Sequence, residues 1–172
     1  MKNNKYFFFW KSKSPFSNWY LETYTVIKQT EVGAESSYQL TFNCSEMAMM
    51  YEKAMLFGDI ITAGKILKEQ NPRKQKALGR EVKNFIKEIW EEKREEIVYL
   101  VLKDKFLNGS QRIKNYLKNT AGLILVEASP YDEVWGIGMA EDEPGVYDEE
   151  NWKGLNLLGK LLTKLRIELY GE

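Results

Sequence analysis

The distribution of apolar residues divides the chain into an N-terminal part with strand character and a longer part with helix character. Aromatic and β-branched residues are concentrated in residues 6–10, 24–27 and 38–42, a composition typical of β-strands. The last two runs are separated by residues 31–37, which contain Gly33 and predict an exposed hairpin loop. These features predict a small antiparallel β element near the N-terminus.

Beyond the third strand the apolar residues recur at helical spacing, and capping residues mark where the helices should begin. Asn43, with Glu46 three residues later, resembles a capping box at the start of the first helix. Asp59 is placed to cap the second helix, and Asn71 before a proline predicts the start of the third. The expected helices span approximately residues 45–57, 60–70, 72–79, 81–107, 111–118 and 155–170.

A strand candidate and a long irregular segment lie between the last two expected helices. Residues 123–126 are continuously apolar, which predicts a buried strand. Residues 127–152 contain two prolines and three glycines, and a loop of this length inside a compact domain is often functional. Because no repeat, linker or domain boundary is evident, the chain is expected to form one mainly helical domain over residues 1–172.

Composition limits the partners and the compartment. The 25 Lys and Arg residues balance 25 Asp and Glu residues, whereas a protein that grips long nucleic acid usually carries a marked basic excess. Any nucleic-acid contact is therefore expected to be local, at a base or a chain end. The single cysteine, Cys44, excludes an intramolecular disulfide and favours a reducing compartment. No segment resembles a secretory signal or could span a bilayer, so a cytoplasmic protein without membrane contact is expected.

The chain contains no histidine. Ser-His-Asp and Cys-His catalysis and His-bearing zinc sites are therefore excluded. Catalysis would have to use carboxylates, lysines, hydroxyls, tyrosines or backbone dipoles, and neither a metal ion nor a cofactor is expected.

Glu46 and Lys53 are seven residues apart, so both project from one face of the first expected helix, about 10 Å apart along its axis. Met49 and Met50 lie between them. At that separation the carboxylate and the amine would flank a ligand instead of pairing with each other. The alternative interpretation is structural, with Glu46 as a capping residue and Lys53 as an exposed helix charge.

Gly79 and Arg80 precede the expected start of the long helix. A glycine and an arginine at a helix N-terminus can hold a phosphate through backbone N–H groups, the helix dipole and the guanidinium group. The structural alternative is a glycine that ends a helix, followed by a surface arginine.

The segment after the strand candidate combines carboxylates, a tryptophan and glycines. Trp135 offers a flat stacking surface, and Gly136 and Gly138 permit close approach of the backbone to a ligand. A turn around a core tryptophan is the structural alternative. At the start of the last helix, Asn156 precedes Gly159, a residue that destabilises a helix interior and therefore implies close packing or a ligand.

These clusters occur in an order that resembles the NADAR (YbiA-like) superfamily over about residues 7–169. Each feature is weak alone, and the ordered set is specific. The features are Ser14-Pro-Phe-Ser-Asn18, Glu46 with Lys53, Leu78-Gly-Arg80, Trp90, Lys105-Phe106, Leu125-Val-Glu127, Asp132-x-x-Trp135-Gly-x-Gly138, and Gly154-x-Asn156-x-Leu158-Gly159 with Arg166.

The resemblance implies a YbiA-like helical fold and hydrolysis of an N-ribosyl bond. Some members of the superfamily remove ADP-ribose from guanine bases and so oppose a toxin that modifies nucleic acid. Others cleave phosphoribosylamino-pyrimidine intermediates of riboflavin synthesis. Removal of ADP-ribose from guanine is the favoured function. The expected partners are an ADP-ribosylated or phosphoribosylated nucleobase, modified nucleic acid contacted locally, and a paired ADP-ribosyltransferase toxin.

Residue by residue, the resemblance implies catalytic roles for Glu46, Lys53 and Asp132. Lys53 matches the lysine whose amine forms a Schiff base with the ribose, and Lys105 matches another lysine position and is the competing candidate. The residues expected to bind substrate are Phe16, Asn18, Gly79, Arg80, Trp90, Lys105, Glu127, Trp135, Gly136, Gly138 and Asn156.

Two other classes of function remain open. A non-catalytic module that binds ADP-ribose or NAD would need neither a base nor a nucleophile, so the presence of both Glu46 and Lys53 favours an enzyme. A helical interaction protein would have no small-molecule site, and nucleotides would not change its thermal stability.

Overall fold

The computed structural model describes residues 5–29 and 36–171, and the chain groups into two compact units. The helical unit is Asn18–Gln111, and the terminal unit is Met1–Ser17 together with Arg112–Glu172. The expected mainly helical fold is confirmed at this level, with strands confined to two small sheets. The expectation of a single domain over residues 1–172 stays a prediction.

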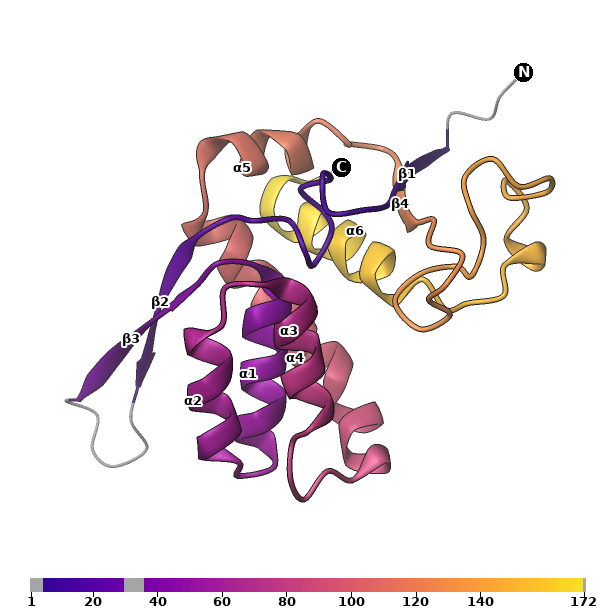
Figure 1. The fold of residues 1–172 in the computed structure, drawn as a ribbon. Helices are drawn as coiled ribbons and strands as arrows, with labels where there is room; N and C mark the ends of the chain where they lie inside the picture. The colour runs from indigo at the N-terminus through magenta and orange to yellow at the C-terminus, as the bar shows by residue number, and fades with distance from the viewer. Residues whose placement is uncertain (1–4, 30–35, 172) are drawn as a thin grey trace. The chain divides into compact units, whose positions relative to one another are not determined.

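The helical unit is built around one helix, α1, which contacts the other three helices of the unit (Figure 1). Eight of its residues are buried, including the polar Ser45 and Glu46. These two polar side chains are therefore held in the interior of the unit. The helices of the unit are α1 (Ser45–Leu56), α2 (Ile60–Lys68), α3 (Pro72–Arg80) and α4 (Lys87–Asn108).

A two-stranded hairpin of β2 (Tyr24–Gln29) and β3 (Ser37–Phe42) completes the helical unit. The strands are antiparallel, with Tyr24 paired to Phe42 at one end of the hairpin. This pairing confirms the small antiparallel element expected near the N-terminus. Residues 30–35, where most of the predicted hairpin loop falls, lie outside the described residues.

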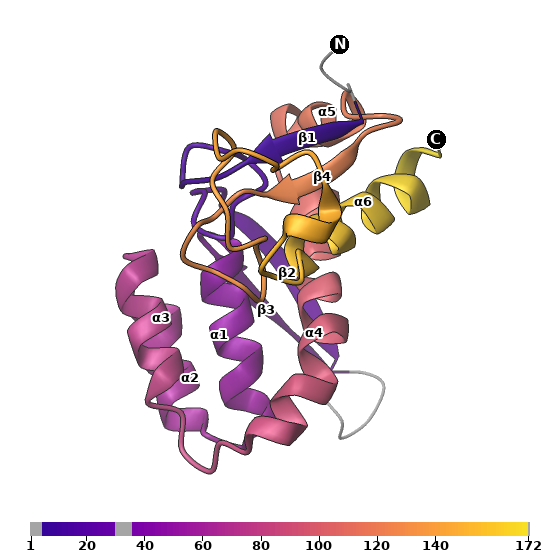
Figure 2. The same ribbon diagram turned by 90° about the vertical axis from the view of Figure 1, so that its right-hand side faces the viewer.

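The first aromatic run forms β1 (Tyr6–Phe9), which pairs in parallel with β4 (Ile124–Glu127) in the terminal unit (Figure 2). The sequence did not predict this pairing, because a parallel partner requires a long crossover and leaves no local turn to recognise. Helix α6 (Leu157–Tyr170) contacts β4. Helix α5 (Gln111–Lys118) precedes β4 along the chain. The core beside this sheet consists of Val126, Ala128, Ile137, Met139 and Val146, with Tyr6, Phe8, Ile124 and Trp152 packed against it.

Two predicted helix caps are confirmed. Asp59 Oδ1 accepts a hydrogen bond from the Thr62 backbone N–H at 3.0 Å at the start of α2. Asn71 Oδ1 accepts from the Arg73 backbone N–H at 2.9 Å at the start of α3. Both caps are local interactions, which is why the sequence predicts them well.

The predicted capping box of Asn43 and Glu46 is wrong. The N-cap of α1 is Cys44, whose side chain makes no capping hydrogen bond. The side chain of Asn43 instead donates to the Gln70 carbonyl at 2.8 Å and accepts from Gln75 Nε2 at 3.0 Å. These long-range partners take the amide group that would have capped the helix.

The long helix begins six residues later than expected, at Lys87 instead of residue 81. Asn84 has a φ of 58°, in the left-handed region that a helix cannot include. The Lys83 backbone N–H donates to Asp59 Oδ2 at 2.9 Å. Residues 81–86 are therefore held as a non-helical connection by a carboxylate on a distant segment.

Among the helices of the described ranges, none is long and apolar enough to cross a bilayer.

Candidate functional site

Lys53 of α1 lies in a polar and aromatic environment next to the last turn of α3. Its Nζ donates to the Gly79 carbonyl at 2.7 Å and lies 4.4 Å from the ring centroid of Phe85. The ring centroid of Trp90 is 5.6 Å from the same nitrogen. The side chain is half-buried, so the alternative of an exposed helix charge is wrong.

Burial lowers the pKa of Lys53 below its ordinary value of 10.5. The negative charge of Glu46 raises this pKa, and the positive charge of Arg80 lowers it. A lowered pKa increases the fraction of neutral amine, which is the nucleophilic form of lysine. Met49 and Met50, which lie between Glu46 and Lys53 along the helix, are both buried.

Glu46 lies in the first turn of α1 and is 3% exposed. Because Cys44 is the N-cap, Glu46 is the second residue of α1, so its interpretation as the N3 residue of a capping box is wrong. The Glu46 backbone N–H donates to the Asn18 carbonyl at 2.9 Å. Asn18 is also buried, and its Oδ1 has no hydrogen-bond partner within the described part of the chain. A buried acceptor without a partner is costly in a folded protein and is a candidate contact for a ligand.

Gly79 and Arg80 lie in the last turn of α3 and not at a helix N-terminus, so the expected phosphate site on backbone N–H groups is wrong. This end of a helix presents carbonyl groups and the negative end of the dipole, which suit the Lys53 ammonium instead. A Cβ on residue 79 would overlap the side chain of Met50, which would have to move, so Gly79 permits the close packing of α3 on α1. Arg80 is exposed, and phosphate binding by its guanidinium group stays a prediction.

Lys105, the competing lysine, is fully buried in α4. Burial lowers its pKa to about 8, against the opposing influence of Cys44 and Glu22. Its Nζ lies 5.6 Å from the Tyr20 ring centroid and 5.5 Å from that of Phe106. A substrate could reach this amine only if the surrounding side chains moved, whereas Lys53 retains exposed surface.

In the terminal unit, Asp132 organises the loop that follows β4. Its Oδ1 accepts from the backbone N–H groups of Val134 at 2.9 Å and Trp135 at 2.8 Å. This arrangement is a side-chain-stabilised turn that fixes the backbone of the half-buried Trp135. The catalytic role expected for Asp132 stays a prediction and would use its other carboxylate oxygen.

Asn156 joins the start of α6 to β4. Its Oδ1 accepts from the Glu127 backbone N–H, and its Nδ2 donates to the Leu125 carbonyl, both at 3.0 Å. Its φ of 52° lies in the left-handed region, which asparagine tolerates better than most residues. A Cβ on Gly159 would overlap the Leu125 carbonyl, so the glycine serves close packing. The side chain of Asn156 therefore has a structural function, and substrate binding by it stays a prediction.

The remaining predicted residues of the terminal unit have mixed outcomes. A Cβ on Gly136 would lie 2.9 Å from the carbonyl oxygens of Asp132 and Glu127, and Gly138 has a φ of 65°. The loop itself therefore needs both glycines. Phe16 is fully buried, with its ring 4.8 Å from that of Tyr116. Phe16 is a core residue, and its expected contact with substrate stays a prediction.

The structure brings the predicted residues together in two sets, one in each unit. Sequence reasoning missed Phe85, whose ring lies near the Lys53 amine, because residues 81–86 had been assigned to the long helix. No local pattern could have identified it. The set in the helical unit is Asn18, Glu46, Lys53, Gly79, Arg80 and Trp90, and the set in the terminal unit is Glu127, Asp132, Trp135, Gly136, Gly138 and Asn156.

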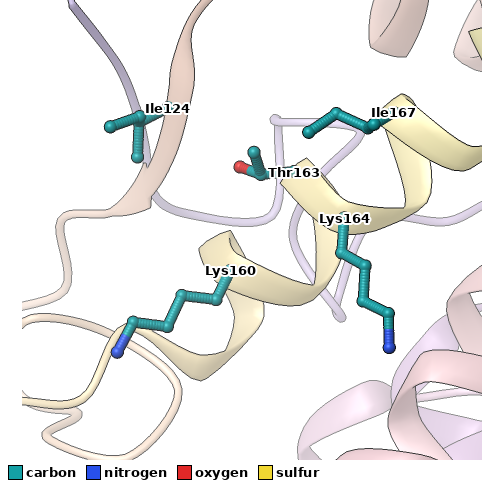
Figure 3. A pocket seen from close by; sticks show the side chains of 5 residues that line it. All are labelled: Ile124, Lys160, Thr163, Lys164 and Ile167. Carbon is teal, nitrogen blue, oxygen red and sulfur yellow. The ribbon is translucent and has the colours of Figure 1, made fainter. Parts of the chain in front are cut away.

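A separate surface hollow of about 350 Å³ lies beside α6 (Figure 3). Its lining is Ile124, Lys160, Thr163, Lys164 and Ile167, none of which was a predicted site residue. The Thr163 hydroxyl is already bonded to the Leu125 backbone N–H and the Gly159 carbonyl. The hollow thus has an apolar floor without convergent polar groups. Within residues 5–29 and 36–171, no three His, Cys, Asp or Glu side chains are grouped so that they could hold a metal ion.

Comparison with known proteins gives consistent matches. The family model described as the NADAR domain matches residues 7–170. Protein irg-1 of Caenorhabditis elegans is 38% identical over 171 residues, covering 94% of this chain and 78% of that protein. N-glycosidase R617 of Acanthamoeba polyphaga mimivirus is 35% identical over 174 residues, covering 98% of each chain.

Two further matches are more limited in what they show. Riboflavin biosynthesis protein PYRR, chloroplastic, of Arabidopsis thaliana is 35% identical over 112 residues, which is 63% of this chain and 17% of the plant protein. The NMR structure of the E. coli protein YbiA matches with a TM-score of 0.71 and 23% identity, covering 98% of this chain and 87% of that one. This second match shows a YbiA-like fold.

Proposed function

Because the chain belongs to the NADAR family, we propose that it hydrolyses a ribosyl N-glycosidic bond and that its preferred substrate is ADP-ribose attached to a guanine base. A relative that covers the chain from end to end is named an N-glycosidase. The observation that carries the proposal is the environment of Lys53. Its amine is half-buried, donates to the Gly79 carbonyl, lies beside two aromatic rings, and shares a helix with the buried Glu46.

The chemistry follows from these groups. After the ribose ring opens, the neutral Lys53 amine attacks C1, forms a C=N bond, and releases the guanine amine, which takes up a proton. Water then hydrolyses the imine, which restores the lysine and frees ADP-ribose, so that one water is consumed overall. Glu46 is the group on the same helix that can carry protons to and from these steps.

Other residues have supporting roles in the proposal. Arg80 would pair with the phosphates, since a guanidinium group suits phosphate geometry. Trp90 and Trp135 are the rings available for stacking the base. Asp132 would act as a second acid–base group in addition to its function in the turn. An ADP-ribosyltransferase would be the source of the modified guanine.

A second candidate substrate is a phosphoribosylamino-pyrimidine, because two plant relatives are named riboflavin biosynthesis proteins. The bond broken is again an N-ribosyl bond, so the same lysine and carboxylate would serve. The matched part of each plant protein is less than one fifth of its length, which makes this the weaker candidate.

The test is to incubate the protein separately with ADP-ribosylated guanosine monophosphate and with a phosphoribosylamino-pyrimidine, and to identify the products by mass spectrometry. We expect release of free ADP-ribose from the first substrate by the unchanged protein and by Lys65→Ala, an exposed lysine variant on α2. Lys53→Ala should release none. Binding of ADP-ribose without turnover in the unchanged protein would instead identify a non-catalytic module and refute the proposal.

A further inference from the structure

Trp10 and Tyr131 form an aromatic pair on the surface of the terminal unit. Tyr131 is 87% exposed, and its ring centroid lies 6.0 Å from that of Trp10, with the planes inclined by 51°. Lys11 Nζ lies 4.8 Å from the Trp10 ring centroid. The exposure of the Tyr131 ring is not explained by packing of the core.

The pair arises from the parallel pairing of β1 and β4. Phe9 is opposite Glu127 at the carboxyl ends of the two strands, and the Ala128 backbone N–H donates to the Phe9 carbonyl at 2.9 Å. The residues that follow both strands therefore emerge at the same edge of the sheet, which is where ligands commonly bind in parallel sheets.

Two lysines accompany the rings at this edge. Lys11 has a φ of 67°, and its carbonyl accepts from the Ser14 backbone N–H at 3.2 Å, so the chain turns sharply after β1. This turn leaves Lys11 and Lys13 exposed. Next to Tyr131, the loop after β4 carries two carboxylates, the exposed Glu133 and the half-buried Asp132, whose Oδ1 is already bonded to the backbone N–H groups of Val134 and Trp135.

We propose that Trp10, Lys11, Lys13 and Tyr131 form a platform that binds single-stranded nucleic acid beside the modified guanine. A base can stack on exposed aromatic rings regardless of its sequence, and lysines neutralise the adjoining phosphates. Because the chain has no net charge, the contact is limited to the nucleotides next to the target. The inference rests on the proposed function and narrows the substrate to an ADP-ribosylated base within a strand.

The platform adjoins the part of the terminal unit that was expected to contact substrate. Tyr131 directly precedes Asp132, whose Oδ1 fixes the turn that carries Trp135. A nucleotide stacked on Tyr131 therefore brings its neighbour in the strand toward this turn, which gives Trp135 a base to contact.

The first test is direct binding of a short, labelled, unmodified oligothymidylate, followed by fluorescence anisotropy. Tyr131→Ala should weaken binding by roughly 5- to 150-fold, and Tyr131→Trp should retain it. The double variant Lys11→Ala with Lys13→Ala should reduce the slope of log affinity against log salt by about 1.4. The matched control is Lys160→Ala with Lys164→Ala on α6, which should keep the original slope. Equal affinity in Tyr131→Ala, or an equal change of slope in the control, would overturn the platform.

The second test separates the platform from the catalytic proposal. It compares kcat/KM for ADP-ribosylated guanine within an oligonucleotide with kcat/KM for the modified mononucleotide. Tyr131→Ala should lower the ratio of these two values, whereas an equal loss on both substrates would overturn the platform and assign Tyr131 to the loop's own structure. If neither substrate is hydrolysed but oligothymidylate binding still depends on Tyr131, the platform stands and the proposed hydrolysis fails.

Discussion

The helical unit and the terminal unit differ in how completely their predicted site residues are bonded to the backbone. On α1, Glu46 is buried, and the half-buried Lys53 is bonded to one backbone group, the Gly79 carbonyl at the end of α3. After β4, by contrast, Asp132 Oδ1 and both polar atoms of Asn156 are bonded to backbone groups. The two sets look alike in the sequence, as polar residues in apolar surroundings. Substitution of Glu46 or Lys53 should therefore mainly reduce turnover, and substitution of Asp132 or Asn156 should mainly lower the free energy of unfolding.

The largest effect is expected for Lys53→Ala. This change should abolish turnover, because it removes the only proposed nucleophile, while the free energy of unfolding should fall by less than about 1.5 kcal/mol, the net worth of one hydrogen bond. Turnover and urea unfolding measure the two quantities. Borohydride added during turnover should leave a ribosyl adduct on Lys53. An adduct on Lys105 would move the nucleophile to α4.

Glu46→Gln should reduce the rate by about 10²- to 10⁴-fold, the range for losing a positioned acid–base group. Glutamine has nearly the same shape, so the free energy of unfolding should change little. The measurement is kcat with urea unfolding of the same preparation. An unchanged rate would mean that the buried carboxylate of Glu46 has only a structural function. The proposed difference between the two units would then not hold for this residue.

Asp132→Asn tests whether the terminal unit contributes to chemistry as well as structure. Asparagine retains Oδ1, so the turn and the free energy of unfolding should be preserved, while the rate should fall by at most about 10²-fold. Asp132→Ala should in addition lower the free energy of unfolding by about 1–2 kcal/mol, because two backbone N–H groups lose their acceptor. A full rate in Asp132→Asn would restrict this residue to the turn.

Asn156→Ala should lower the free energy of unfolding by about 2–5 kcal/mol. It leaves a backbone N–H and a carbonyl of β4 without partners and places alanine at a left-handed φ. Urea denaturation measures the loss, with the exposed Asn119→Ala as the control. A loss below about 1 kcal/mol would show that the backbone groups find other partners and that the contrast between the units is weaker than proposed.

The smallest expected effect is on the pH dependence of stability and involves Asp59, a carboxylate of the helical unit that accepts hydrogen bonds from the backbone. Hydrogen bonds from the Lys83 and Thr62 backbone N–H groups lower the pKa of Asp59 to about 2, from 3.8. A depressed folded-state pKa contributes stability above the unfolded-state pKa, and this contribution is lost as pH falls from about 4 to about 2. Acid titration of unfolding should show this loss, and Asp59→Asn should reduce it. Identical acid profiles would contradict the assignment.

The sequence predicted what depends on neighbouring residues. The caps at Asp59 and Asn71 are confirmed, because a cap is decided within three residues. The family resemblance gave the fold, which the NADAR match and the YbiA structure confirm at the level of the mainly helical architecture.

The failures all involve distant partners. Asn43 did not cap α1 because Gln70 and Gln75 bind its side chain, and residues 81–86 are not helical because Asp59 holds Lys83. The parallel pairing of β1 with β4 likewise joins segments from the two ends of the chain. Phe85 became a neighbour of Lys53 only through this connection, so no periodicity in the sequence could indicate it.

The contact between α6 and β4 also has a consequence for aggregation. The outer edge of β4 would offer the Leu125 and Glu127 N–H groups and the Leu125 carbonyl to a strand of another molecule. Thr163 and Asn156 bond these three groups, so α6 occupies the place of a neighbouring strand. A short parallel sheet rich in phenylalanine is in this way closed to intermolecular pairing on that side. Variants that detach α6 should consequently form β-rich aggregates before they lose their helices.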